Sequence, residues 1–422
     1  MSKRVLILST TTGYQLRSFG DAAQALGIEL VFVTDRCHAL EDPWRDGAIA
    51  IRFHEEDAAV ETVVAEAARR PVHGILAVGD RPVVLGARIA EALGLPGNPP
   101  HAARASTNKR LTRERLARAG LHVPEFLISS TRADVVPLAV RLPYPVVVKP
   151  IVLSGSRGVI RADTPTQLVA AFQRVSTLLS RFDIRAQRSG GEGEILVESF
   201  IPGHEYAIEG VVTDGRFTAF AIFDKPDPLD GPFFEESIYV TPPAISAETE
   251  WAILHAVQSA VSALGLRNGP VHAECRVNSE GVYVLEVAAR PIGGLCSKVL
   301  RFGTGSAVRS LEYVLLQHAL GHDVSRESRE TEAAAVMMIP IPARGVLRGV
   351  SGESDARLVQ FVEDVQITAR RDQLLEPLPE AGSYLGFIFA RGPLPAQVEA
   401  AVREAHQRLV FTVVPAIDVR AG

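Results

Sequence analysis

The chain has 422 residues, more than one typical hydrophobic core supports, so two to four domains are expected. Hydrophobic residues make up 47% of the chain and charged residues 22%, a balance that excludes a largely disordered protein. The formal net charge is -5 and no run of lysines or arginines forms a basic tail, which disfavours a nucleic-acid partner and favours small-molecule chemistry.

The cysteines and the apolar runs bear on the compartment. Cys37, Cys275 and Cys296 are far apart and form no CxxC pair, so neither a disulfide framework nor a zinc site is indicated. The apolar run at the amino terminus is too short for a signal-peptide core, and no apolar segment approaches the ~20 residues that span a bilayer. We expect a soluble cytoplasmic protein with no membrane partner.

Residues 1–104 are predicted to form a parallel α/β domain. Buried-strand runs at 4–10, 29–35 and 73–80 alternate with helical apolar spacing at 17–26 and 82–95. The first turn, STTTGYQ, lacks the G-x-G-x-x-G fingerprint of a dinucleotide site. We therefore interpret this domain as a Rossmann-like scaffold that packs beside the active site.

A Pro- and Gly-rich stretch and a capping cluster, Ser106-Thr107-Asn108, place a domain boundary near residue 105 and a helix from Lys109. Beyond it the pattern is α+β. The strand-like segments are 143–150, 193–202, 205–224, 271–277 and 282–289, and the clearest helix is 247–266. Turn residues at 213–216 and 278–281 predict two antiparallel hairpins. The expected divisions are 105–195, 196–330 and a small carboxy-terminal α+β lobe, 331–422, with strands in 333–350, 362–369 and 384–392 and a final helix from 396.

Lys149 ends the apolar run of PVVVKP, where an unpaired ammonium would be costly, so it should have an anionic partner. That partner could be a structural carboxylate, but the next residues favour a ligand. Gly155 and Gly158 permit a tight turn and a close approach to a ligand, while Ser154 and Ser156 add hydroxyl donors. The loop is not GxxxxGK[ST], which disfavours a P-loop NTPase. It nevertheless suits a polyphosphate.

Two glutamates carry the strongest signal. If the hairpin in GPVHAECRVNSEGVYVLEVAARPIGG turns about Glu280, Glu274 and Glu286 lie opposite each other, whereas a register shifted by one would separate them. Two adjacent carboxylates beside a polyphosphate suit Mg²⁺. Arg290, just past the second strand, adds a fixed positive charge for a phosphoryl group or a carboxylate.

Three further residues are candidates for substrate contact. The irregular segment 223–243 carries Glu236 and Tyr239, which we expect on a substrate-facing loop, with Glu236 suited to an ammonium group; a solvated surface glutamate is the alternative. On a regular strand His272 points to the same side as Glu274. It would then assist substrate binding or take a proton from the amine, or else be a structural histidine.

These blocks resemble the ATP-grasp superfamily of carboxylate–amine ligases. The resemblance rests on Lys109, Lys149 with its Gly-Ser loop, ILVESFIPGHEY and HAE…LEVAARPIGG, from about Gly79 to Gly294. The carboxy-terminal MMIPIPARGVLRGV and SYLGFIFARG look like the end domain of L-amino acid ligases. The resemblance thus covers nearly the whole chain.

The resemblance implies an ATP-grasp fold and a role for each matching residue. Lys109 and Lys149 would contact the ATP phosphates and residues 154–158 would form a flap over them. The adenine would meet the backbone of Glu198, Ser199, Phe200 and Ile201, and the ribose would meet Glu205. Glu274 and Glu286 would bind Mg²⁺, with Mn²⁺ as an alternative, and Arg290 would steady the transferred phosphoryl group. Gly293 and Gly294 would face the substrate.

The implied reaction forms an acyl phosphate and ADP from a carboxylate and ATP, then an amide from an amine, with amino acids as substrates and a dipeptide as product. The family also allows a homodimer. Ala288 departs from a common Asn two residues after the second metal glutamate, so fewer protein oxygens would complete the metal's coordination. Two alternatives stay open: another ATP-grasp reaction, such as a biotin- or purine-type carboxylation, and a non-catalytic nucleotide-binding relative. Arg157 stays outside the catalytic set.

Overall fold

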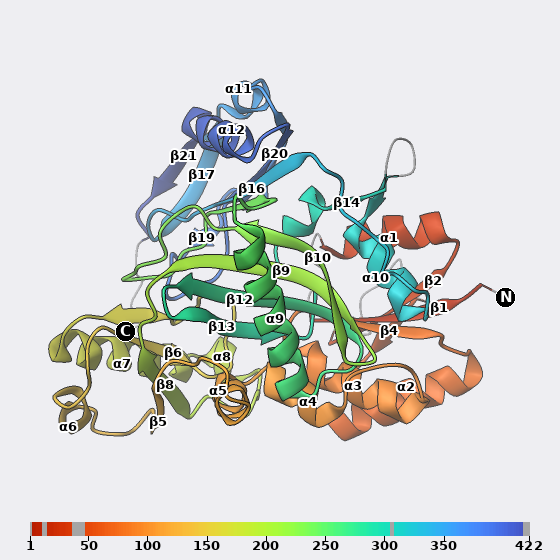
Figure 1. Ribbon diagram of the computed structural model, residues 1–422, viewed down its shortest axis with the longest axis horizontal. Helices are drawn as coiled ribbons and strands as arrows, with labels where there is room; N and C mark the ends of the chain where they lie inside the picture. The colour runs from red at the N-terminus through yellow and green to blue at the C-terminus, as the bar shows by residue number, and fades with distance from the viewer. Residues whose placement is uncertain (1, 11–14, 36–46, 304–307, 417–422) are drawn as a thin grey trace.

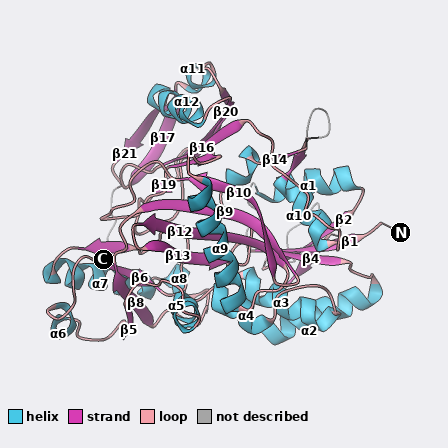
Figure 2. Cartoon of the chain, viewed as in Figure 1, coloured by secondary structure: helices cyan, strands magenta, loops and turns pink. Residues whose placement is uncertain are grey.

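The computed structural model describes residues 2–10, 15–35, 47–303 and 308–416. Part of the STTTGYQ turn and the whole of Cys37 lie outside these described residues. The chain forms a parallel amino-terminal sheet, a smaller antiparallel sheet, and a large antiparallel sheet (Figures 1 and 2). This arrangement confirms the expected multidomain α/β and α+β class. Among the described helices, none combines the length and the apolar character needed to cross a membrane.

The amino-terminal sheet is covered on both faces, as the expected α/β unit requires. Its elements are β1 (Arg4–Ser9), α1 (Gln15–Leu26), β2 (Glu29–Thr34), β3 (Ala48–Ala50), α2 (Glu56–Arg69), β4 (Gly74–Val78) and α3 (Pro82–Leu93), with parallel strand order β3-β2-β1-β4. Side chains alternate along β1: Val5 and Ile7 pack toward α1 and the distant helix α10 (Leu311–Ala319), while Leu6 and Leu8 pack toward α2 and α3. The carboxyl end of β4 is therefore held rigidly.

The smaller sheet follows two linking helices. Its elements are α4 (Pro100–Ser106), α5 (Lys109–Arg118), β5 (Phe126–Ser130), α6 (Val136–Ala139), β6 (Val146–Pro150), β7 (Ile160–Ala162), α7 (Pro165–Ser180), α8 (Phe182–Arg185) and β8 (Glu194–Ser199). Asn108 caps α5 by accepting a hydrogen bond from the Leu111 N–H at 3.2 Å, as the capping cluster predicts. The strand order is β5-β8-β6-β7, so a division at 195/196 would cut β8. We propose a boundary near residue 200.

The large sheet crosses another expected boundary. It begins with β9 (His204–Thr213), β10 (Arg216–Asp224), β11 (Ile238–Thr241), α9 (Ala247–Leu264), β12 (Gly269–Asn278) and β13 (Gly281–Ala288), and the connection to the next lobe holds η1 (Cys296–Val299), β14 (Arg301–Phe302), β15 (Arg309–Ser310) and α10. The strand order is β13-β12-β9-β10-β11-β16-β20-β18, so the division at 330/331 lies between paired strands of a continuous sheet. Both predicted hairpins, β9–β10 and β12–β13, are confirmed.

The carboxy-terminal lobe extends this sheet and adds a three-stranded one. Its elements are β16 (Ala333–Ile339), β17 (Gly345–Ser351), α11 (Glu353–Arg357), β18 (Val362–Ile367), β19 (Leu374–Leu375), β20 (Gly386–Gly392), α12 (Pro395–Arg408) and β21 (Val410–Val414). Helix α12 packs its apolar face on β16 and β20, and β17 pairs with β19 and β21. Because β16 pairs with β11, the lobe reaches the cavity described below.

Candidate active site

The two predicted metal glutamates do face each other, but only because the strand register is irregular, which their spacing in the sequence does not show. The hairpin pairs Asn278 with Gly281, so its turn is centred between Ser279 and Glu280 and would place Glu274 opposite Leu285. An irregularity between Glu274 and Cys275 shifts the register by one residue and pairs Glu274 with Glu286. Both side chains line the same cavity.

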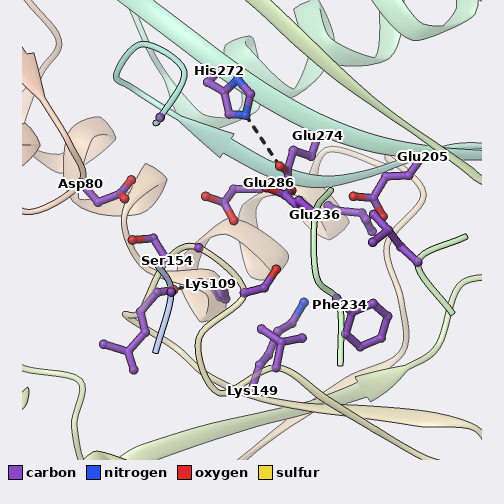
Figure 3. A pocket seen from close by; sticks show the side chains of 18 of the residues that line it. Asp80, Lys109, Lys149, Ser154, Glu205, Phe234, Glu236, His272, Glu274 and Glu286 are labelled. Carbon is purple, nitrogen blue, oxygen red and sulfur yellow. Dashed lines mark hydrogen bonds and ion pairs between the residues drawn. The ribbon is translucent and has the colours of Figure 1, made fainter. Parts of the chain in front are cut away.

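That cavity has a volume of about 320 Å³ and lies where the described parts of the chain converge (Figure 3). The smaller sheet and its helices contribute Lys109, Lys149 and the flap (residues 154–158), and the large sheet contributes His272, both glutamates and Arg290. The predicted site residues that line it are Lys109, Lys149, Ser154, Gly155, Ser156, Glu198, Ser199, Phe200, Ile201, Glu205, Glu236, Tyr239, His272, Glu274, Glu286, Arg290, Gly293 and Gly294. Gly158 lies in the flap but does not line the cavity.

Lys149 has both an ion-pair partner and a place on the cavity wall. Its ammonium pairs with Glu198, whose other partner is the fully buried guanidinium of Arg113, with Arg113 Nε 2.9 Å from Glu198 Oε2. Burial alone would raise the pKa of Glu198, but Arg113 and Lys149 outweigh it and hold that pKa at about 2. Burial lowers the pKa of Lys149 despite Glu198. The Glu198 side chain is therefore part of the wall's internal ion-pair network and not a surface group.

The backbone expected to meet adenine is already partly engaged. The Ser199 N–H donates to the Glu125 carbonyl at 2.8 Å, and the Phe200 N–H donates to the Pro145 carbonyl at 3.0 Å. Arg276 Nη1 donates to the Ile201 carbonyl at 2.8 Å. Among the described residues the Ile201 N–H has no hydrogen-bond partner. It is therefore the backbone donor of this segment that can bind a ligand.

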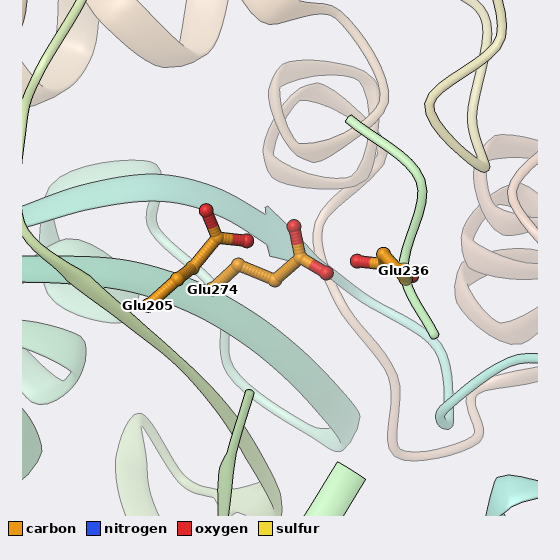
Figure 4. A group of neighbouring side chains, drawn as sticks. All are labelled: Glu205, Glu236 and Glu274. Carbon is orange, nitrogen blue, oxygen red and sulfur yellow. The ribbon is translucent and has the colours of Figure 1, made fainter. Parts of the chain in front are cut away.

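Three carboxylates, from Glu205, Glu236 and Glu274, converge within 4.8 Å of one another (Figure 4). Lys225 already pairs with all three carboxylates: its ammonium lies 2.8 Å from Glu205, 2.6 Å from Glu236 and 3.0 Å from Glu274. The second oxygen of Glu205 accepts from Arg276 Nε at 2.8 Å, so both oxygens of the expected ribose ligand have protein partners.

Charge within this cluster is divided unequally. Burial raises the pKa of Glu236 to about 7 although Lys225 opposes the shift, whereas Lys225 and His272 overcome burial and hold the pKa of Glu274 well below its usual value. Tyr239 is buried in β11 and not on a loop, which corrects our expectation; its ring lies 5.0 Å from the Lys225 ammonium. The irregular segment that does face the cavity ends before Ile238.

Glu286 differs from the three clustered carboxylates. It lines the cavity, and within residues 2–10, 15–35, 47–303 and 308–416 its carboxylate accepts no hydrogen bond and forms no ion pair. A half-buried carboxylate beside Glu274, with no ion-pair partner among the described residues, is the donor type that a hard divalent cation requires. The pair Glu274 and Glu286 therefore fits Mg²⁺ better than the trio, which already surrounds Lys225.

His272 is buried and held by a carboxylate behind it. Its Nδ1 lies 3.1 Å from Glu209 Oε2, and its Nε2 lies 3.6 Å from Glu274 Oε1. Burial would lower the pKa of His272, but Glu209 and Glu274 outweigh it and raise that pKa to about 9. The Ile292 N–H donates to both oxygens of Glu209. Glu209 thus ties His272 to the segment that carries Gly293 and Gly294.

The flap is held by the carboxy-terminal lobe. Gly155 and Gly158 have φ angles of +62° and +77°, as the loop's expected tight turn requires. The Gly158 N–H donates to the Pro379 carbonyl at 2.9 Å, and Arg157 Nε donates to the Glu380 carbonyl at 2.7 Å. Arg157 therefore does not line the cavity. Its side chain joins the flap to the carboxy-terminal lobe.

Several residues of the site are absent from the sequence-based set: Asp80, Arg113, Glu209, Lys225, Arg276, Met338, Gly382 and Tyr384. One of them had a usable signal. Asp80 is the last residue of the strand-like run 73–80, and ligands of α/β sheets gather at the carboxyl ends of parallel strands. The remainder depend on pairings between distant segments.

Comparison with known proteins adds three family matches. Residues 142–299 match the ATP-grasp domain, residues 20–97 the ATP-grasp N-terminal domain, and residues 337–414 the L-amino acid ligase C-terminal domain 2. Together they cover β2, β3 and β4 of the parallel sheet, most of the residues that line the cavity, and most of the last lobe.

Individual relatives agree with these matches. The crystal structure of an L-amino acid ligase from Bacillus licheniformis is 29% identical, with a TM-score of 0.83 over 98% of this chain and 99% of that one. The ATP-grasp enzyme fsqD of Aspergillus fumigatus is 30% identical over 63% of this chain, which spans 46% of that relative's length. Dapdiamide A synthase of Enterobacter agglomerans is 27% identical over 68% of each chain.

Proposed function

Because the chain belongs to the ATP-grasp family and carries an L-amino acid ligase C-terminal domain, we propose that it joins the carboxylate of one amino acid to the amine of another and consumes ATP. The observation that carries this proposal is the pairing of Glu274 with Glu286 at the wall of a cavity that also holds Lys109, Lys149 and Arg290. The products are a dipeptide, ADP and phosphate.

The nucleotide would lie between the flap and the large sheet. Lys109 and Lys149 would neutralise phosphate oxygens, the Ile201 N–H would meet the adenine edge, and Glu205 would face the ribose. Glu274 and Glu286 would hold Mg²⁺ or Mn²⁺. Such a cation neutralises phosphate charge as the phosphoryl group moves.

In the first step a substrate carboxylate oxygen attacks the γ-phosphorus of ATP, the bond to ADP breaks and an acyl phosphate forms. The fixed charge of Arg290 would stabilise the transferred group, since catalysis of phosphoryl transfer consists largely of positioning and charge neutralisation. The Arg290 side chain is 11% exposed and lines the cavity, so its charge acts where little water is present.

In the second step the amine attacks the acyl carbon, phosphate leaves, and the nitrogen loses a proton. Glu236 is the carboxylate proposed to receive the ammonium group, with Tyr239 behind it. His272 is proposed to contact the reacting groups from the Glu274 side. Met338 and Tyr384 of the carboxy-terminal lobe line the cavity and would bound the substrate side chains.

A phosphate-release screen over pairs of amino acids, with mass spectrometry of the products, tests the proposal. We expect ADP and a dipeptide from at least one pair. AMP and pyrophosphate would instead indicate an adenylating enzyme, and turnover that requires bicarbonate would indicate carboxylation.

The non-catalytic alternative rests on Ala288, which is buried and pairs with His272 across the β12–β13 ladder. Nucleotide binding without ADP formation, over the full screen, would favour it. Size measurement by light scattering would decide the proposed homodimer.

A further inference from the structure

Arg290 is held by a residue of a different domain. Its Nε lies 3.0 Å from Asp80 Oδ1 and its Nη2 lies 3.4 Å from Asp80 Oδ2, a two-pronged contact. Its one other hydrogen bond among the described residues runs from Nη1 to the adjacent Pro291 carbonyl at 3.1 Å. Asp80 therefore sets the direction in which the guanidinium points.

Asp80 is itself firmly placed. It follows β4 directly, after Gly79 with a φ of +91°, and α3 begins two residues later at Pro82. The parallel sheet and the covering helix leave this turn little freedom. A carboxylate held in this way can fix the position of the long Arg290 side chain, which reaches it from the end of the large sheet.

The same carboxylate meets the phosphate side of the cavity. The Ser154 side chain of the flap and the charge of Lys109 both act to lower the pKa of Asp80, and all three residues line the cavity. Burial would raise the pKa of Asp80, but the Arg290 guanidinium outweighs burial and holds it below the usual value. Asp80 thus stays ionised and has no proton to donate.

We propose that Asp80 is a positioning residue: it fixes the Arg290 guanidinium at the place where the acyl phosphate forms, so that the amino-terminal domain takes part in the reaction and is not only a scaffold. This inference rests on the proposed ligase function. Arg290 would otherwise sample several rotamers, because a long side chain with one neighbouring carbonyl as partner is weakly restrained.

The kinetic test compares Asp80→Asn and Asp80→Glu with the wild type. Asp80→Asn is expected to lower kcat for ADP formation roughly 10- to 100-fold, the range for loss of a charge-assisted hydrogen bond, while KM for ATP changes less than about 3-fold. Asp80→Glu keeps the charge and should recover part of kcat. Asp57→Asn, which breaks the exposed pair with Arg88 in the same domain, is the matched control with unchanged kcat.

A second measurement does not need turnover. In protein labelled with ¹⁵N-arginine, the Arg290 Nε–H signal, assigned by its loss in Arg290→Lys, should exchange slowly with solvent in the wild type and faster in Asp80→Asn. Wild-type kcat in Asp80→Asn, or unchanged Nε–H exchange, would overturn the inference. If the wild type forms no ADP from any pair, the ligase proposal fails and the exchange comparison alone decides whether Asp80 positions Arg290.

Discussion

Lys225→Met should destabilise the protein strongly, because it removes a buried cation that pairs with three carboxylates, one of them buried and two half-buried. Lys225 is 3% exposed, so water cannot replace its charge. One oxygen of each carboxylate lies within 4.8 Å of the others, and two unit charges at that distance repel by roughly 3.5 kcal/mol at an effective dielectric constant of about 20. Removing one partner of a buried ion pair commonly costs about 3–5 kcal/mol. We expect a loss of that size in the free energy of unfolding.

The assay is urea unfolding at pH 8 with EDTA present, so that no divalent cation replaces the lysine. Lys298→Met is the control, since Lys298 is exposed and lies over the Phe389 ring without a carboxylate partner among its described contacts. Its unfolding free energy should stay within about 0.5 kcal/mol of the wild type.

The loss of unfolding free energy in Lys225→Met should depend on pH, and the direction of the change can be predicted. Burial would lower the pKa of Lys225, but the carboxylates around it outweigh burial and raise that pKa, while Lys225 lowers the pKa of Glu274. Their mutual stabilisation is therefore present above about pH 4.5 and below about pH 10.5, the ordinary values of the two groups. The difference between Lys225→Met and the wild type should therefore be largest near pH 8 and should shrink as the pH falls below about 4.5. A Lys225→Met protein as stable as the wild type at pH 8, or a difference that grows in acid, would refute the reasoning.

Three other predictions concern the same cavity. The pKa of Glu236 is raised to about 7, so its contribution to stability is present below about pH 4.5 and is lost as the pH rises through 7; Glu236→Gln should flatten this fall in a series of unfolding measurements. Glu286→Gln and Lys149→Ala should each lower ADP formation at least about 100-fold, and wild-type-like turnover in either folded variant would contradict the proposed site. Glu380→Ala removes the 2.6 and 2.8 Å contacts with Arg174 on α7 and should speed amide exchange in the flap; an unchanged exchange rate would show that the backbone bonds alone hold it.

Local patterns in the sequence predicted most of the helices and strands and many of the residues that line the site. Alternating apolar residues predicted the strands of the parallel sheet, and turn residues at 213–216 and 278–281 predicted both hairpins, because side-chain period and turn chemistry act over a few residues. The glycines of the flap were predicted for the same reason, and their positive φ angles bear this out. The family resemblance, read from motifs, is shown by the domain matches.

The charge network depended on tertiary contacts. The pairing of Glu274 with Glu286 needs a bulge that shifts the register by one residue, and a bulge is set by packing of the whole sheet. Lys225 pairs with all three carboxylates of a cluster that would otherwise look like a metal site. Asp80 reaches Arg290 across 210 positions of sequence. The chain by itself determined which side chains could carry the chemistry; the fold decided which charges meet, because an ion pair depends on distance in space and not on spacing along the chain.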